Sequence, residues 1–190
     1  NLGLVFNELK EFQNSINCYE KVIQIDSNHT DAHNNLGMVF YKLKDFQNSI
    51  NYYEKAIQID SNNVHAYNNL GNSLIGLERT KEAVDYYKKA IEIDSNYIKA
   101  HENLGIVFYK LREFQKAISC HKKAIQLDPN NLNSHNNLGI IFHQLRQFQN
   151  AKSYFKKAIQ IDPNHPDVNF SFGMLLLSMS DFKNGFIKYE

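Results

Sequence analysis

Asparagine recurs in one column of this sequence, at positions 34 residues apart. A carboxamide carries two N–H donors and a carbonyl acceptor, so it can pair with both the N–H and the C=O of one peptide unit. Asparagine is also a mediocre helix former, up to ~0.7 kcal/mol worse than alanine. The column consists of Asn1, Asn35, Asn69, Asn103 and Asn137 and ends at Ser171. It predicts a ladder of amides that holds the backbone of an extended peptide.

A second explanation of the column stays open. The repeats of one chain are not independent samples, and this chain is rich in asparagine throughout. Repeats that were duplicated recently would carry the same asparagine by descent, with the side chain facing water. Only an effect on binding separates the two explanations.

Glycine has the same spacing and indicates which elements must position the column. The glycines in question are Gly3, Gly37, Gly71, Gly105, Gly139 and Gly173. Equal intervals along the whole chain predict one supersecondary unit copied end to end, as in a solenoid. In residues 30–63, apolar residues spaced by three and four predict one helix through Ala32 and Leu43 and another through Phe46 and Ile59. Asp45 is the expected N-cap of the second helix.

The recurring glycine is expected to be structural. A glycine inside a helix costs roughly 0.5–1 kcal/mol relative to alanine, so packing must compensate for it. Each glycine is expected to face a small residue of the second helix, and large neighbours such as Phe40 and Tyr53 would fill the flanks. The expected pairs are Gly37 with Ser49, Gly71 with Ala83, Gly105 with Ala117, and Gly139 with Ala151.

Leu36-Gly37, Phe40, Tyr53 and Ala56, repeated with a period of 34, resemble the tetratricopeptide repeat. The resemblance covers the whole chain and implies an all-α fold, an α-solenoid that forms a right-handed superhelix of antiparallel helix pairs. It makes the whole chain a single array of repeats. The array consists of a partial repeat 1–29, full repeats 30–63, 64–97, 98–131 and 132–165, and a partial repeat 166–190. Both ends cut through a repeat, which suggests a fragment of a longer protein.

Two departures from the family pattern concern single positions of the repeat. Histidine replaces the usual large aromatic residue at the start of the first helix in three repeats, as a packing residue: His33, His101 and His135. Charged residues replace a common glycine at the turn within the repeat: Lys44, Glu78, Arg112 and Arg146. Neither departure changes the fold assignment.

The resemblance implies a protein-interaction module whose first helices line a concave groove. The expected peptide-binding residues are Asn34, Asn35, Met38, Tyr41, Asn68, Asn69, Asn72, Asn103, Ile106, Tyr109 and Asn137. The column itself resembles the asparagine ladder of the superhelical repeats in O-linked N-acetylglucosamine transferases. The carboxylate clamp of chaperone-binding members is not expected, because only Asn69 and Lys99 match its pattern.

Two other function classes stay open. The parent protein could be a glycosyltransferase whose substrate-recognition arm this is, and residues 182–190 resemble the closing repeat of bacterial proteins of that kind. Alternatively, the chain could be a scaffold that makes contacts through its convex side or its ends. The cut terminal repeats predict end-to-end self-association.

Composition excludes several further classes. With 21 basic and 20 acidic residues the formal charge is +1, which argues against a nucleic-acid partner. No apolar run approaches the ~20 residues of a membrane helix. No catalytic constellation, metal site or cofactor motif is visible, so this chain is not expected to be an enzyme. Cys18 and Cys120, three repeats apart, are expected to be unpaired thiols, which favours the cytoplasm.

Overall fold

The computed structural model describes residues 2–179, and the chain forms two compact units, Asn1–Ala100 and His101–Glu190. The division falls inside one helix, after Ala100. The first member of the asparagine column, Asn1, lies outside the described residues, as does the run 182–190. All the secondary structure within residues 2–179 is helical.

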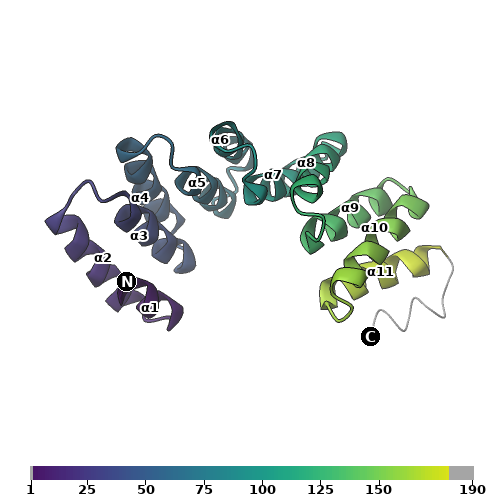
Figure 1. Cartoon of the computed structure of the whole chain (residues 1–190), viewed down its shortest axis with the longest axis horizontal. Helices are drawn as coiled ribbons and strands as arrows, with labels where there is room; N and C mark the ends of the chain where they lie inside the picture. Colours follow the sequence, from purple (N-terminus) through teal and green to yellow (C-terminus); the bar gives the residue numbers. More distant parts are fainter. Residues whose placement is uncertain (1, 180–190) are drawn as a thin grey trace. The chain divides into compact units, whose positions relative to one another are not determined.

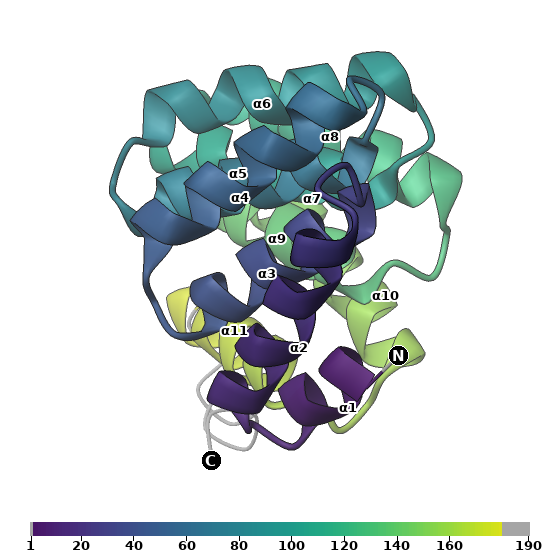
Figure 2. The ribbon, with the colours of Figure 1, turned by 90° about the vertical axis from the view of Figure 1, so that its left-hand side faces the viewer.

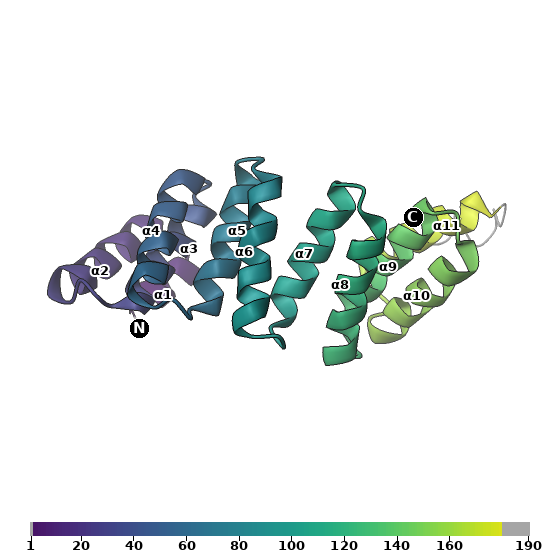
Figure 3. The same cartoon turned by 90° about the horizontal axis from the view of Figure 1, so that it is seen from above.

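The amino-terminal unit consists of consecutive helical hairpins (Figure 1). Its helices are α1 (Leu2–Glu8), α2 (Phe12–Ile25), α3 (Thr30–Lys42), α4 (Phe46–Ile59), α5 (Val64–Gly76) and α6 (Thr80–Ile93). Figure 3 shows α3 beside α4 and α5 beside α6, and Figure 2 views this unit from the α1–α2 end. The second helix of a hairpin also packs on the first helix of the next hairpin, α2 against α3 and α4 against α5. The hairpin predicted from residues 30–63 is confirmed at both helices.

The carboxy-terminal unit repeats this organisation. Its helices are α7 (Ile98–Lys110), which begins before the division, α8 (Phe114–Leu127), α9 (Leu132–Gln144), α10 (Phe148–Ile161) and α11 (Pro166–Ser178). Within it α9 packs against α10, and α11 packs against both of them. The all-α solenoid of 34-residue helical hairpins is thus confirmed in each unit.

Short polar residues cap several of the helices. The Asp45 side chain accepts a hydrogen bond from the Asn48 N–H at 3.2 Å, as the N-cap prediction required. Asn63 and Asn131 cap α5 and α9 in the same way. At the end of α4, Asp60 accepts from the Asn62 N–H at 3.0 Å and holds the turn that leads to the next repeat.

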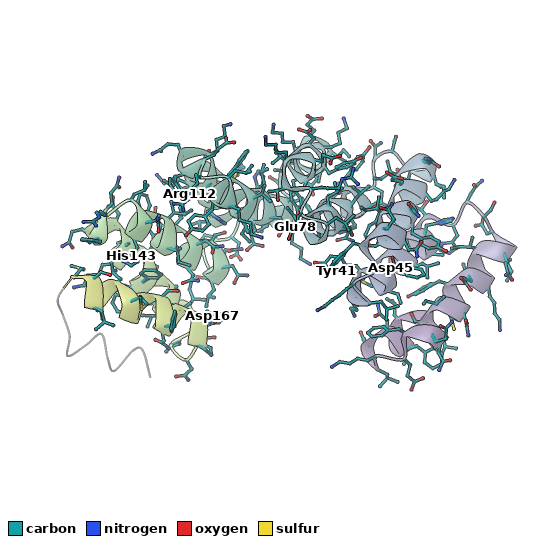
Figure 4. All side chains as sticks on the ribbon, turned by 180° about the vertical axis from the view of Figure 1, so that it is seen from behind. Tyr41, Asp45, Glu78, Arg112, His143 and Asp167 are labelled. Carbon is teal, nitrogen blue, oxygen red and sulfur yellow. The ribbon has the colours of Figure 1, made fainter. Side chains whose placement is uncertain are left out.

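Within residues 2–179, the turns inside the repeats adopt the left-handed conformation without glycine. The residues with positive φ are Lys10, Lys44, Glu78, Arg112 and Arg146, all with φ between 57° and 62°. Figure 4 labels Glu78 at the α5–α6 turn and Arg112 at the α7–α8 turn. A side chain in this conformation costs roughly 1–2 kcal/mol. The turn geometry is therefore kept although its usual residue is absent.

The recurring glycine makes room for an aromatic ring. A Cβ on Gly37 would lie 2.7 Å from the ring of Tyr53, which is fully buried. The expected contact with Ser49 also exists, since the Ser49 hydroxyl donates to the Gly37 carbonyl at 2.8 Å. The expectation that Tyr53 only fills the flank was wrong, because the ring lies directly on the glycine. The same ring position is held by Tyr19, Tyr87, His121 and Phe155.

The histidines at the start of the first helices are packing residues, as predicted. His33 and His135 are buried, and their rings lie 6.2 Å from Tyr52 and 6.0 Å from Tyr154. Each Nε2 lies about 3 Å from a backbone carbonyl of the preceding turn, that of Ser27 or Pro129. The imidazole therefore ties the helix to that turn.

Candidate peptide-binding face

The asparagine column lies on the first helices of the hairpins, at half-buried positions. In the amino-terminal unit it comprises Asn35 on α3 and Asn69 on α5, and in the carboxy-terminal unit Asn103 on α7 and Asn137 on α9. Within residues 2–179, no hydrogen bond engages the amide of Asn35 or Asn137. These two carboxamides keep their full hydrogen-bonding capacity while much of each side chain is covered.

Two of the expected contact residues make hydrogen bonds within the protein. Asn68 is only 2% exposed, and its Nδ2 donates to Asn69 Oδ1 at 3.3 Å. It orients the column residue and has little surface to offer a ligand. Asn72 is half-buried, and its Oδ1 accepts a 2.7 Å hydrogen bond from the hydroxyl of the buried Tyr87. The sequence could not show this bond, because it depends on where the tyrosine ring ends.

Apolar side chains accompany the column. Tyr41 is 38% exposed and packs edge-on against Phe46, with ring centroids 5.6 Å apart, at the end of α3 (Figure 4). Ile106 on α7 is 39% exposed. Among the other expected contact residues, Asn34, Met38 and Tyr109 are half-buried. First helices that carry both asparagine amides and exposed apolar side chains suit a ligand that has both a polar backbone and apolar side chains.

Other kinds of site find little support in the described residues. No group of three or more His, Cys, Asp or Glu side chains there could hold a metal ion. No helix in residues 2–179 is long and apolar enough to cross a membrane. Cys18 and Cys120 are free thiols, and burial raises the pKa of Cys120 to about 11. That thiol stays protonated at neutral pH and is a poor nucleophile.

Sequence reasoning missed one feature, a cavity beside His33 and a second beside His135. Histidine at these positions is interpreted from the sequence only as a packing residue. The signal that could have revealed the cavities is a paired change in repeat 64–97, which has Tyr67 and Glu92 where the other full repeats have histidine and glutamine.

Hairpins of two antiparallel helices, repeated every 34 residues, define an all-α repeat protein of the solenoid class. The chain belongs to the tetratricopeptide repeat family. Family models described as tetratricopeptide or TPR repeats match residues 28–96, residues 98–131 with 133–165, and residues 3–44. None of the curated proteins matches the sequence significantly.

Solved structures share the fold at low sequence identity. MamA is 24% identical, with 86% of this chain and 95% of that chain covered and a TM-score of 0.77. YrrB, described as a TPR protein with an unusual peptide-binding site, is 22% identical over 90% of this chain and 88% of its own, with a TM-score of 0.71. PilF of Pseudomonas aeruginosa is 23% identical over 98% and 85%, with a TM-score of 0.88. At these identities the likeness concerns the fold alone.

Proposed function

We propose that this protein-interaction module binds an extended peptide or protein segment along its first helices, with the asparagine column holding the backbone. The observation that carries the proposal is the state of Asn35 and Asn137. Their amides are half-covered yet unused by the rest of residues 2–179. A carboxamide at such a position can donate to a peptide C=O and accept from a peptide N–H.

The neighbouring side chains support the same kind of ligand. Tyr41 and Ile106 expose apolar surface on the helices that carry the column. Contact with such side chains removes apolar area from water, at about 25 cal/mol per Å². Asn68 steadies Asn69 through its 3.3 Å hydrogen bond, so this ladder amide is partly oriented before a ligand arrives. That YrrB has a peptide-binding site agrees with the proposal.

The proposal is tested with peptides selected for binding to the full chain from a display library of random dodecamers. We expect the quadruple variant Asn35→Ala, Asn69→Ala, Asn103→Ala and Asn137→Ala to fold normally, since alanine is the better helix former. Each lost hydrogen bond weakens binding by about 0.5–1.5 kcal/mol, without full additivity, so calorimetric titration should show at least a roughly tenfold rise in Kd.

Asparagines of the second helices provide the matched control. Asn17 on α2 and Asn51 on α4 are exposed, so changing both to alanine should leave Kd unchanged. Unrelated peptides should lose affinity to a similar extent with the quadruple variant, because the ladder reads the backbone. If Kd is the same for the wild type and the quadruple variant, descent explains the column. A loss of folding would instead assign the asparagines to internal structure.

A further inference from the structure

Each unit contains a cavity of about 620 Å³ next to the buried histidine of its first helices. In the amino-terminal unit the lining comes from α2, the α2–α3 turn, α3 and α4. It includes Ile23, Asn28, His33, Lys55, Gln58 and Ile59. The asparagine column does not contribute to this lining, so the cavity is a feature separate from the candidate peptide-binding face.

The cavity in the carboxy-terminal unit has the same construction, 102 residues further along the chain. Its lining includes Ile125, Asn130, His135, Lys157, Gln160 and Ile161. Of the seven lining positions only one differs, where Ser27 is replaced by Pro129. The turn in each wall is held by an aspartate that accepts from the Asn28 or Asn130 N–H at 3.0 Å. Both cavities are therefore framed by fixed backbone.

The lining combines one cation with apolar and amide groups. Lys55 brings a positive charge, and neither lining contains an acidic residue. Lys55 is exposed, and its Nζ donates a long hydrogen bond of 3.4 Å to Gln58 Oε1. Ile23 and Ile59 offer apolar surface. A ligand that matches this lining has an aliphatic part and a negatively charged group at its end.

Of the two repeats between the cavities, repeat 64–97 provides a natural contrast. Five of the seven lining positions are the same there, and the two that differ are Tyr67 and Glu92, in place of His33 and Gln58. Lys89, the counterpart of Lys55, is engaged by Glu92 in a 3.0 Å salt bridge. Tyr67 also brings a larger ring. In this repeat the cation is already paired, whereas both repeats with a cavity leave it without an acidic partner in the lining.

We propose that each cavity binds a carboxylate carried by an aliphatic chain. The lysine ammonium pairs with the carboxylate, and the Asn and Gln amides donate further hydrogen bonds to its two oxygens. The two isoleucines contact the aliphatic chain. The carboxylate belongs either to the C-terminus of a partner that ends in an aliphatic residue or to a small free acid. Both share the chemistry that the lining recognises.

The first test titrates ¹⁵N-labelled full chain with 4-methylpentanoate at neutral pH. We expect saturable shifts of the backbone amides of Asn28, Lys55 and Gln58 and of their counterparts Asn130, Lys157 and Gln160, with Kd of about 1–10 mM for so small a ligand. The uncharged 4-methylpentanamide should bind about five- to tenfold more weakly. Equal binding of acid and amide, or no saturable shift, would overturn the proposal.

The variant Gln58→Glu reproduces, in the first cavity alone, the paired lysine of repeat 64–97. It should raise Kd there about five- to tenfold, while the cavity at Lys157 keeps its affinity and serves as an internal control. The reverse variant, Tyr67→His with Glu92→Gln, should create saturable shifts at Asn62 and Lys89 that the wild type lacks. Unchanged affinity in the first variant and no gained site in the second would contradict the assignment.

A third experiment, with peptides, identifies the source of the carboxylate. A hexapeptide that ends in leucine with a free carboxylate is compared with its C-terminal amide and with 4-methylpentanoate. Tighter binding of the free-acid peptide supports a partner's C-terminus, and equal binding of the two acids supports a small free acid. Tighter binding of the amidated peptide would overturn the proposal for both sources.

Discussion

The buried aromatic ring on the recurring glycine is the most constrained contact within a repeat. Sequence spacing identified the glycine and the small residue twelve positions later, and both touch as expected. It did not identify the ring sixteen positions later, because periodicity marks Tyr53 as buried without showing where its side chain ends. The absence of a Cβ at Gly37 is therefore required by Tyr53.

Gly37→Ala tests this contact. The new Cβ would lie 2.7 Å from the Tyr53 ring, which has no free space to move into. Overpacking costs about 1–3 kcal/mol and exceeds the roughly 0.5–1 kcal/mol that alanine gains in a helix. We expect a lower melting temperature in circular dichroism. In a Tyr53→Leu background the same change should be neutral or stabilising. A Gly37→Ala variant that melts with the wild type would contradict the close contact.

His121 occupies this ring position in the repeat 98–131 and is the one imidazole among the rings that do so. It is fully buried, with Nδ1 3.3 Å from the Ser134 hydroxyl and Nε2 without a partner in the described residues. Burial lowers the pKa of His121 to about 4, from an ordinary value of 6.5. The fold therefore holds this imidazole in its neutral form.

The stability of the carboxy-terminal unit should fall with acid because of His121. Between pH 6.5 and 4, His121 binds a proton in the unfolded chain but not in the folded chain. Stability is therefore lost as the pH falls through this window. From pH 7 to 4.5 the loss is about 2–3 kcal/mol. His121→Phe, which copies the ring of Phe155, combined with Ser134→Ala should remove that part of the pH dependence in urea unfolding. Equal pH dependence in both proteins would show that His121 is not buried as described.

At the scale of the element, the turns within the hairpins keep a shape that their residues do not favour. Lys44 has a φ of 60° between α3 and α4. The Asp45 N–H still bonds to the Phe40 carbonyl at 2.9 Å, so the closure of α3 fixes the conformation. The hairpin geometry determines this turn, and the side chain tolerates it.

Lys44→Gly should stabilise the protein, although glycine usually destabilises. Relief of the left-handed strain is worth roughly 1–2 kcal/mol, partly offset by the greater freedom of glycine in the unfolded chain. We expect a net gain of about 0.5–1 kcal/mol in urea unfolding. Lys42→Gly, two residues earlier in the last turn of α3, is the matched control and should cost up to about 1 kcal/mol. Destabilisation by both changes would contradict the strain at Lys44.

The elements themselves were largely predictable, whereas the positions of individual side chains were not. The 34-residue period, the apolar spacing and the cap at Asp45 are local signals, and they predict both helices of the hairpin. The burial of Asn68 and the bond from Tyr87 to Asn72 depend on packing between helices. Helical periodicity carries no information about either.

At the scale of the molecule, each unit is a complete packing arrangement of hairpins. The single array, the end-to-end association and the membership of a larger glycosyltransferase stay predictions. The central claim concerns chemistry that both units share: half-covered amides on the first helices, two of which have no hydrogen bond within residues 2–179. Such amides can bind a peptide backbone irrespective of the side chains that the peptide carries.

The most direct test replaces backbone amides of a selected dodecamer, one at a time, by esters. An ester lacks the N–H that an asparagine Oδ1 would accept, so at least one replacement should weaken binding to the wild type by about 0.5–1.5 kcal/mol, a roughly 2- to 13-fold rise in Kd. The quadruple asparagine variant should bind that ester and its parent peptide equally. If every ester binds the wild type as well as the parent peptide does, or if the variant keeps the full difference, the asparagine column does not hold the backbone.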